Sequence, residues 1–139
     1  MKKVFLLAIL SVLVVAGCSS QTISRNDYNN SYKPPAGTPS LEILRPLNGD
    51  AINSSIISIK INVTNFQLVD VAANRTNVEN QGYVIYVLDE IRAVKSVYKD
   101  YSIANVAPGR HTLMVELRNN DNTPLSPPVK KSVTVSVTG

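Results

Sequence analysis

The sequence predicts an all-β fold, an immunoglobulin-like antiparallel β-sandwich of about seven strands, over residues 41–139. Short segments in which apolar and polar residues alternate recur along this stretch, with turn-forming residues between them. No segment there has the apolar spacing of an amphipathic helix. The chain has 139 residues, and the first 17 form the N-terminal signal sequence considered below. The remaining 122 residues are enough for one such domain and a short leading segment.

The first half of the domain contains the clearest strand. An initial strand is expected around residues 41–43, and a turn follows at Asn48-Gly49-Asp50. In residues 57–64, β-branched apolar residues alternate with polar ones, which is typical of a half-buried antiparallel strand. We expect Phe66 and Leu68 to continue that strand.

The second half begins after a long polar connection at residues 72–81. Residues 83–88 are apolar on both faces, which indicates a central strand or one whose outer face is covered. Residues 90–98 fit either an edge strand or a short helical turn. The remaining strands are expected at 101–103, 113–117 and 133–137, with turns at 107–109 and 119–124.

Successive residues of the segment 83–88 point to opposite faces of a sheet, so alternate residues share one face. The residues in phase with the core are Val84, Tyr86 and Leu88. An apolar row then lies on the outer face, formed by Tyr83, Ile85 and Val87. Either residues 90–98 or 72–81 cover this row, or it is an interface with a partner or a second copy. Large apolar side chains are more often buried than exposed, so we favour the interpretation in which this row is covered.

The N-terminus resembles the signal sequence of a secreted lipoprotein. Two lysines precede an apolar run over residues 4–16, which suits a secretory signal and is too short to span a bilayer as a helix. The run ends in Val15-Ala16-Gly17-Cys18, which is similar to a lipobox, where small residues precede a cysteine that is diacylated on sulfur. We expect removal of the signal peptide, residues 1–17, palmitate-type lipidation of Cys18, and a disordered, flexible tether over residues 18–40. The alternative is an ordinary signal peptide with an incidental cysteine.

Lipidation of Cys18 would determine where the protein resides. Cys18 is the only cysteine, so the domain has no disulfide and depends on its hydrophobic core. Two or three acyl chains attach a protein to a membrane stably. Ser19 and Ser20 resemble an outer-membrane sorting signal of Gram-negative lipoproteins. The expected location is the cell envelope, on the periplasmic side of the outer membrane or at the cell surface.

Charge provides no argument for a nucleic-acid partner. The chain has 14 Lys and Arg against 10 Asp and Glu, and two of the lysines, Lys2 and Lys3, leave with the signal peptide, so 12 remain. These basic residues are scattered, and Lys130-Lys131 is their only adjacent pair. We therefore expect a solvated surface and no binding of nucleic acid.

Three motifs punctuate the domain: Pro46 to Gly49, Pro108-Gly109-Arg110-His111-Thr112-Leu113, and Asn120 to Pro128. With them, residues 41–138 resemble an uncharacterised family of secreted immunoglobulin-like or cupredoxin-like sandwich domains in bacteria and archaea. Its members open with Pro-x-Asn/Asp-Gly and close with Pro-Gly-x-His-Thr-Leu followed by Asn-Asp-His-x-Pro-Leu. The resemblance implies a β-sandwich.

The family pattern also contains histidines that this chain lacks. In the family strand Gly-His-x-His-x-x-x-Asp, the two histidines correspond to Tyr83 and Ile85, and the loop histidine corresponds to Asn122. Two histidines on one strand face could chelate copper or zinc, whereas Tyr and Ile cannot. The remaining candidate metal ligands are weak: His111, Asp89 and Asp121. The simpler interpretation of His111 is a turn histidine that hydrogen-bonds a nearby backbone group.

No catalytic motif is present in the sequence. A Gly-rich phosphate loop and a Gly-x-Ser-x-Gly nucleophile motif are both missing, and the adjacent Asp89 and Glu90 would point to opposite faces of a strand. Asp121 lies in an Asn-rich loop without the acidic density of a strong Ca²⁺ site. We therefore expect no catalytic residues, no enzymatic activity and no cofactor.

Asn-x-Ser/Thr sequons are candidate glycosylation sites at Asn53, Asn62 and Asn74, and another occurs at Asn29. They would matter in an archaeal host. A chain rich in Asn and Ser also produces such sequons by chance, which is the simpler explanation.

The sequence therefore predicts a non-catalytic, membrane-anchored envelope lipoprotein whose sandwich binds another envelope protein or a glycan. The alternative is a degenerate cupredoxin-like module that handles copper or zinc. The number of histidines, one in the whole chain, argues against the alternative.

Overall fold

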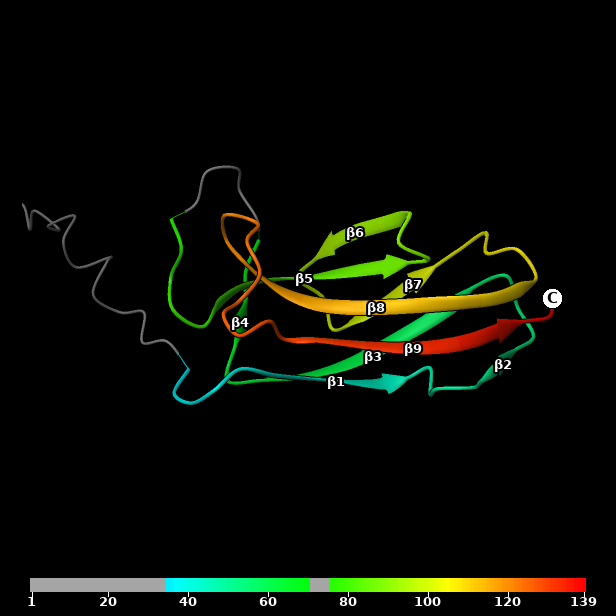
Figure 1. The fold of residues 1–139 in the computed structure, drawn as a ribbon, viewed down its shortest axis with the longest axis horizontal. Coiled ribbons are helices and arrows are strands. Elements are labelled where there is room, and N and C mark those ends of the chain that lie inside the picture. Colours follow the sequence, from blue (N-terminus) through cyan, green and yellow to red (C-terminus); the bar gives the residue numbers. More distant parts are fainter. Residues whose placement is uncertain (1–34, 71–75) are drawn as a thin grey trace, which may run out of the picture. The chain divides into compact units, whose positions relative to one another are not determined.

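The structure, a computed structural model, describes residues 35–70 and 76–139, which form two β-sheets (Figure 1). The first sheet has the order β1-β3-β7, with β1 at Ser40–Arg45, β3 at Ile57–Thr64 and β7 at Asp100–Ile103. The second has the order β2-β9-β8-β5-β4, and β6 also pairs with β5. Its strands are β2 (Ala51–Ile52), β4 (Gln67–Leu68), β5 (Gln81–Leu88), β6 (Arg92–Ser96), β8 (Gly109–Asn119) and β9 (Lys130–Val137).

The predicted immunoglobulin-like sandwich is confirmed. Seven of the strands have four or more residues, and all pairs among these seven are antiparallel. The two-residue strands β2 and β4 instead pair in parallel, with β9 and β5 respectively. Across the two described ranges, no helix is long and apolar enough to cross a membrane.

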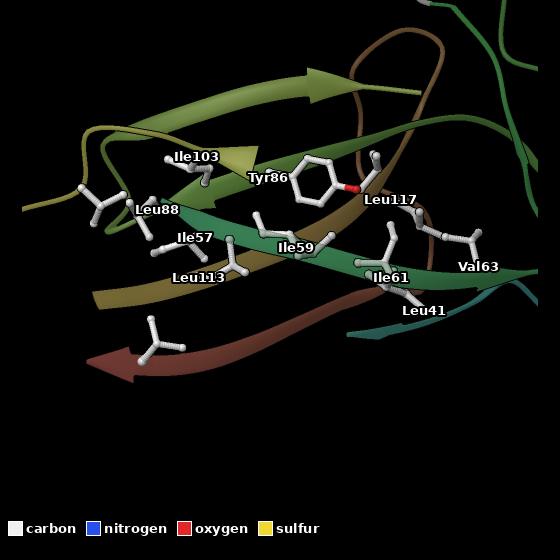
Figure 2. Packing of buried hydrophobic residues seen from close by; sticks show 14 of the residues in the cluster. Leu41, Ile57, Ile59, Ile61, Val63, Tyr86, Leu88, Ile103, Leu113 and Leu117 are labelled. Atoms are coloured by element: carbon white, nitrogen blue, oxygen red, sulfur yellow. The ribbon is translucent and has the colours of Figure 1, made fainter. Parts of the chain in front are cut away.

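The core lies between the two sheets, and both contribute to a single cluster of buried side chains (Figure 2). Along β3, buried and exposed residues alternate without exception, as its sequence predicts. The main contributors to the cluster are Ile57, Ile59, Ile61 and Val63 from β3, Val84, Tyr86 and Leu88 from β5, and Leu113, Val115 and Leu117 from β8.

Tyr86 is the largest polar side chain within this core. Its hydroxyl donates a hydrogen bond to the carbonyl oxygen of Tyr98 at 2.7 Å, and its ring stacks on that of Tyr101 with centroids 5.1 Å apart. Burial, with a smaller contribution from Asp100, raises the pKa of the Tyr86 phenol well above its usual value. The hydroxyl therefore remains a donor, and Tyr86 joins β5 to the β6–β7 segment across the sandwich.

The structure corrects one sequence prediction and decides between two alternatives for another segment. Phe66 and Leu68 do not continue β3, because Asn65 adopts a positive φ of 54° and the chain crosses to the other sheet as β4. Asn tolerates this left-handed conformation better than most residues do. Of the two alternatives for residues 90–98, the structure has the edge strand, β6.

The first described residues and the C-terminus lie at opposite ends of the sandwich (Figure 1). Asn80 Nδ2 donates to the carbonyl oxygens of Pro35 (2.8 Å) and Gly37 (3.2 Å), and Asn65 Nδ2 donates to that of Thr38 (3.1 Å). The predicted domain start at residue 41 therefore falls inside β1, and the residues just before it already pack with the sandwich. At the other end, the backbone amide of Thr138 donates to the Ile52 carbonyl at 3.0 Å.

Candidate functional site

The only histidine of the chain forms a close pair with an aspartate. Asp89 follows the end of β5 in a turn where it and Glu90 have positive φ, and His111 lies near the start of β8. His111 Nδ1 lies 2.7 Å from Asp89 Oδ2, and the Thr112 amide donates to Asp89 Oδ1 at 2.8 Å. His111 Nε2 lies 2.8 Å from the carbonyl oxygen of Ala107. The hydrogen bond predicted between His111 and a nearby backbone group is therefore present.

Because both ring nitrogens of His111 face acceptors, both carry a hydrogen when both bonds form, which is the imidazolium state. The hydrogen bonds to Asp89 and to the Ala107 carbonyl raise the pKa of His111 above 6.5, and burial opposes them only in part. Burial also raises the pKa of Asp89, but hydrogen bonds from His111 and the Thr112 amide, with the His111 charge, lower it overall. The imidazolium has no lone pair to offer a metal ion.

The three weak metal candidates do not converge. Asp89 and His111 are in contact near one end of β8, whereas Asp121 lies beyond the other end of this 11-residue strand. Within the described residues, no group of three or more His, Cys, Asp or Glu is arranged to hold a metal ion. The Asp89–His111 pair instead joins the β5–β6 turn to the start of β8.

This pair predicts a stability that depends on pH. A raised His111 pKa stabilises the fold below pH ~6.5, and this stabilisation is lost as the pH rises through the higher folded-state pKa. A lowered Asp89 pKa stabilises it above pH ~3.8, so the contribution is largest between these limits. From pH ~6 to pH ~8.5, we expect a loss of about 1 kcal/mol, or about 5 °C in Tm, which His111→Gln removes.

The measurement is thermal unfolding of wild type and variant across that pH range, followed by circular dichroism. His111 is the only histidine, and histidine is the only side chain whose ordinary pKa places its charge change between pH 5 and 8. Asp89→Asn serves as the control, because it removes the partner and keeps the imidazole. Parallel Tm profiles for wild type and His111→Gln would show that the pair does not act in this way.

The outer face of β5 is covered by neighbouring side chains. Tyr83 has no exposed surface, Val87 is 8% exposed and Ile85 is half-buried. The Lys95 ammonium of β6 lies 5.4 Å from the Tyr83 ring centroid, and Arg118 of β8 is the register partner of Tyr83. Tyr83 and Val87 therefore offer little surface to a partner, in contrast to the interface interpretation of this row.

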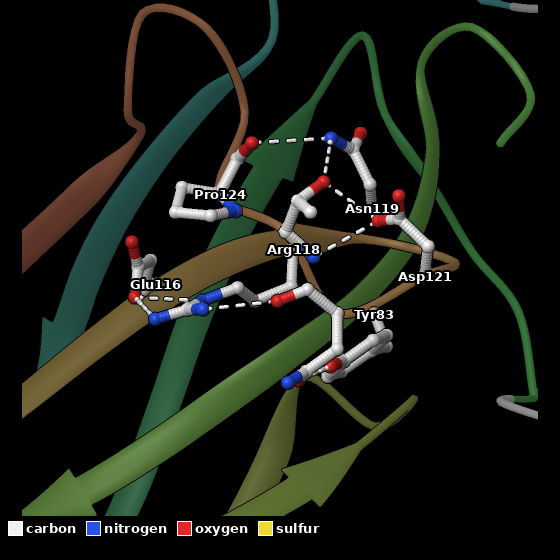
Figure 3. A network of polar contacts seen from close by, with 8 residues as sticks. Tyr83, Glu116, Arg118, Asn119, Asp121 and Pro124 are labelled. Atoms are coloured by element: carbon white, nitrogen blue, oxygen red, sulfur yellow. Dashed lines mark hydrogen bonds and ion pairs between the residues drawn. The ribbon is translucent and has the colours of Figure 1, made fainter.

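A polar network closes the loop after β8 (Figure 3). Arg118 donates to Glu116 Oε2 through Nε (2.9 Å) and Nη2 (2.6 Å), and through Nη1 to the carbonyl oxygen of Asn122 (3.0 Å). The Tyr83 hydroxyl donates to Asn122 Oδ1. Asp121 Oδ1 accepts from the amide and hydroxyl of Thr123 at 2.9 and 2.6 Å. These contacts engage Asp121 within its own turn.

Tyr83 lies in β5, and Asn122 lies in the loop after β8. They are 39 residues apart in sequence and hydrogen-bonded in the structure. The chain therefore holds the loop to β5 with a tyrosine–amide contact at this point.

The structure also has a groove on the side of the sandwich where the edges of β6 and β7 face each other. A recess of about 730 Å³ is lined by Asp70, Val94, Lys95, Ser96, Val97, Tyr98 and Tyr101. An adjoining recess of about 250 Å³ shares Val94 and Tyr101 and adds Arg92, Ser102, Ile103, Ala104 and Asn105. We call the two together the β6–β7 groove.

Core-facing side chains form the floor of the β6–β7 groove. Val94 is the register partner of Tyr86, and Tyr101 is that of Ile59, so both point between the sheets. Both are half-buried, because no further strand lies beyond them among the described residues. Sequence analysis missed this groove, although apolar residues at positions 94, 97, 98 and 101 break the two-residue period there.

The remaining candidate residues are the asparagines of the sequons and the cysteine proposed for lipidation. Asn53 and Asn62 are both exposed, in the loop after β2 and on the outer face of β3. Cys18, Asn29 and Asn74 lie outside the described residues.

Comparisons with known proteins give similarity of fold only. No protein-family model and no curated protein matches the chain. An engineered protein, Northeast Structural Genomics Consortium target OR128, is 10% identical with a TM-score of 0.50, over 76% of this chain and 21% of its own length. The fibronectin(III)-like modules of Clostridium thermocellum CbhA are 16% identical with a TM-score of 0.45, over 70% of this chain and 93% of their own. The extracellular domain of BT4673 from B. thetaiotaomicron is 14% identical with a TM-score of 0.42, over 78% and 16%.

Proposed function

We propose that the chain is a non-catalytic lipoprotein of the cell envelope, anchored in a membrane through Cys18, whose sandwich binds another envelope protein or a glycan. Its N-terminal sequence supports the anchor: two lysines, an apolar run and small residues before the only cysteine. Diacylation of that cysteine, with or without a third chain on its amino group, would make attachment stable.

The observation that carries the binding role is the β6–β7 groove. It combines partly exposed aromatic and aliphatic side chains with charged side chains at its rim, the mixture that recognition surfaces favour. Tyr98, at its edge, is 69% exposed, and Tyr101 presents part of its ring. Tyrosine is enriched at binding surfaces because it offers both an apolar ring and a polar hydroxyl.

The position of residues 35–39, through which the N-terminal segment reaches the sandwich, would leave the groove accessible near the membrane surface. About 17 residues separate Cys18 from Pro35, and such a segment spans at most about 60 Å. The lipid would therefore hold the domain near the bilayer by the end at which residues 35–39 are bound. The groove runs along the side of the sandwich, where a neighbouring envelope component can reach it.

Crosslinking in the envelope tests this proposal. A photoreactive phenylalanine analogue at Tyr98 of the full-length lipoprotein is expected to give a discrete adduct, detected by immunoblot and identified by mass spectrometry or glycan staining. The matched control is the same group at Glu42, an exposed β1 position on the outer face of the other sheet. Equal background at both positions, together with turnover of a substrate by the purified domain, would contradict the proposal.

The contacts of His111 do not favour the alternative function, a module that handles copper or zinc. His111 directs both nitrogens at acceptors, and neither Tyr83 nor Ile85 can replace a strand histidine as a ligand. Elemental analysis of protein purified without a histidine tag tests it directly. One equivalent of copper or zinc that is lost in His111→Ala would favour the alternative.

A further inference from the structure

Strand β6 has one edge to which no other strand of the described residues is paired. Among the described strands it pairs with β5 alone, over residues 92–96. An edge strand directs alternate backbone N–H and C=O groups outward, where they can pair with another extended chain. Two large apolar side chains, Ile91 (85% exposed) and Tyr98 (69% exposed), flank this edge.

The register of β6 fixes what an added strand would meet. Val94 pairs with Tyr86 and therefore lies on the groove side, whereas Lys95 pairs with Ile85 and lies on the outer side. Side chains of an added strand would alternate in the same way. Every second side chain would enter the β6–β7 groove beside Val94 and Tyr101, and the others would lie beside Lys95.

Charge distinguishes the two free edges of the groove. Lys95 is an exposed cation on β6, whereas the exposed carboxylate of Asp100 on β7 lies 3.8 Å from the Lys60 ammonium of β3 and is paired with it. Arg92 adds a second positive charge to β6, and its Nη2 donates to the carbonyl oxygen of Ala104 at 3.0 Å, across the groove. Asp70 is the only acidic residue among the described groove-lining residues. The two cations of β6 therefore favour an acidic strand beside this edge.

We propose that the free edge of β6 binds an extended peptide segment of a partner protein, in which apolar residues facing the groove alternate with acidic residues facing Lys95. The peptide would add a strand to the larger sheet, with main-chain hydrogen bonds giving affinity and the groove giving side-chain specificity. This inference rests on the proposed binding function and assigns its ligand class.

The probe is a fluorescein-labelled peptide of sequence Thr-Val-Glu-Val-Glu-Val-Thr, titrated with the domain and followed by fluorescence anisotropy. We expect saturable binding that weakens with salt, and slower hydrogen exchange of the backbone amides of residues 92–96 in the complex. A peptide with lysine in place of glutamate is expected to bind about fivefold more weakly or worse. A peptide with N-methyl groups on alternate valines keeps the side chains, blocks strand pairing and is expected not to bind.

Two charge variants locate the site. Lys95→Glu is expected to weaken binding of the acidic peptide about fivefold and to strengthen binding of the lysine peptide. Lys131→Glu makes the same change on β9, at a position opposite Val115. Strands β8 and β5 separate β9 from β6, so this variant is expected to leave both affinities unchanged. Both side chains are exposed, so both variants should fold, although Lys95→Glu loses the contact of its ammonium with the Tyr83 ring, which is weak at an exposed site.

Three results would overturn the inference: no binding of the acidic peptide, equal binding of the N-methylated peptide, or unchanged exchange at residues 92–96. Self-association through β6, seen by light scattering and abolished in Lys95→Glu, would also overturn it in favour of a second copy. If the peptide fails while Tyr98 still crosslinks to an envelope component, the ligand class is wrong and the binding function stands.

Discussion

Replacing Gly82 by alanine is expected to lower the free energy of unfolding by ~4 kcal/mol or more, enough to unfold much of the protein. Gly82 lies in β5 between β8, where it pairs with Asn119, and β4, where it pairs with Leu68. A methyl group at this position would lie 1.9 Å from the carbonyl oxygen of Arg118. That oxygen belongs to the backbone of β8, so relief requires the two strands to move apart.

The measurement is urea and thermal unfolding of purified Gly82→Ala, followed by circular dichroism. Gly49→Ala is the matched control, because no atom lies within 4 Å of the added methyl group and the cost arises only from its positive φ of 90°. That control should lose about 1 kcal/mol, or about 5 °C in Tm. A Gly82→Ala protein as stable as this control would mean that β5 and β8 are less closely packed than the structure has them.

Cys18→Ser is expected to abolish lipidation and to leave the precursor uncleaved. The thiol is the acyl acceptor in the proposed pathway, and a serine hydroxyl does not replace it as a nucleophile. Wild-type protein should incorporate labelled palmitate and partition into the detergent phase on warming in Triton X-114, whereas the variant should incorporate none. Intact mass spectrometry should find residues 1–17 still attached.

Ser19→Ala is the control for the lipidation experiment, because it changes the neighbouring residue and leaves the thiol in place. Its acylation should equal that of the wild type, although its distribution between membranes can differ. Normal cleavage of Cys18→Ser, with aqueous partitioning of the wild type, would identify an ordinary signal peptide instead.

The sequence predicted those parts of the fold that depend on local alternation. The two-residue period in β3, β8 and β9 identifies strands, and its phase correctly assigns Ile59, Val115 and Val135 to the core. Strand β5 was harder, because apolar residues occupy both of its faces. The predicted phase of this strand, with Val84, Tyr86 and Leu88 facing the core, is nevertheless confirmed.

Contacts between distant segments could not be predicted in this way. Asp89 and His111 are 22 residues apart, and Tyr83 and Asn122 are 39 apart, so their hydrogen bonds depend on the register between β5 and β8. Alternation gives each strand its faces but not its partner or its register. The β6–β7 groove depends on which strands lie at the edges of their sheets, and that too is decided only by the completed topology.

The position at which the N-terminal segment joins the sandwich has a mechanical consequence. Residues 35–39 are bound at the end where β1 begins and β3 finishes, so tension transmitted through the proposed lipid anchor would enter the sandwich at Ser40 and load β1 along its axis. The β1–β3 hydrogen bonds lie across that axis, from the Ser40–Thr64 pair to the Arg45–Lys60 pair. They would be loaded together in shear rather than broken one at a time, and Leu41 would have to leave the core before β1 could slide. With the proposed anchor and partner in place, β1 would therefore carry the tension between the membrane and the bound partner.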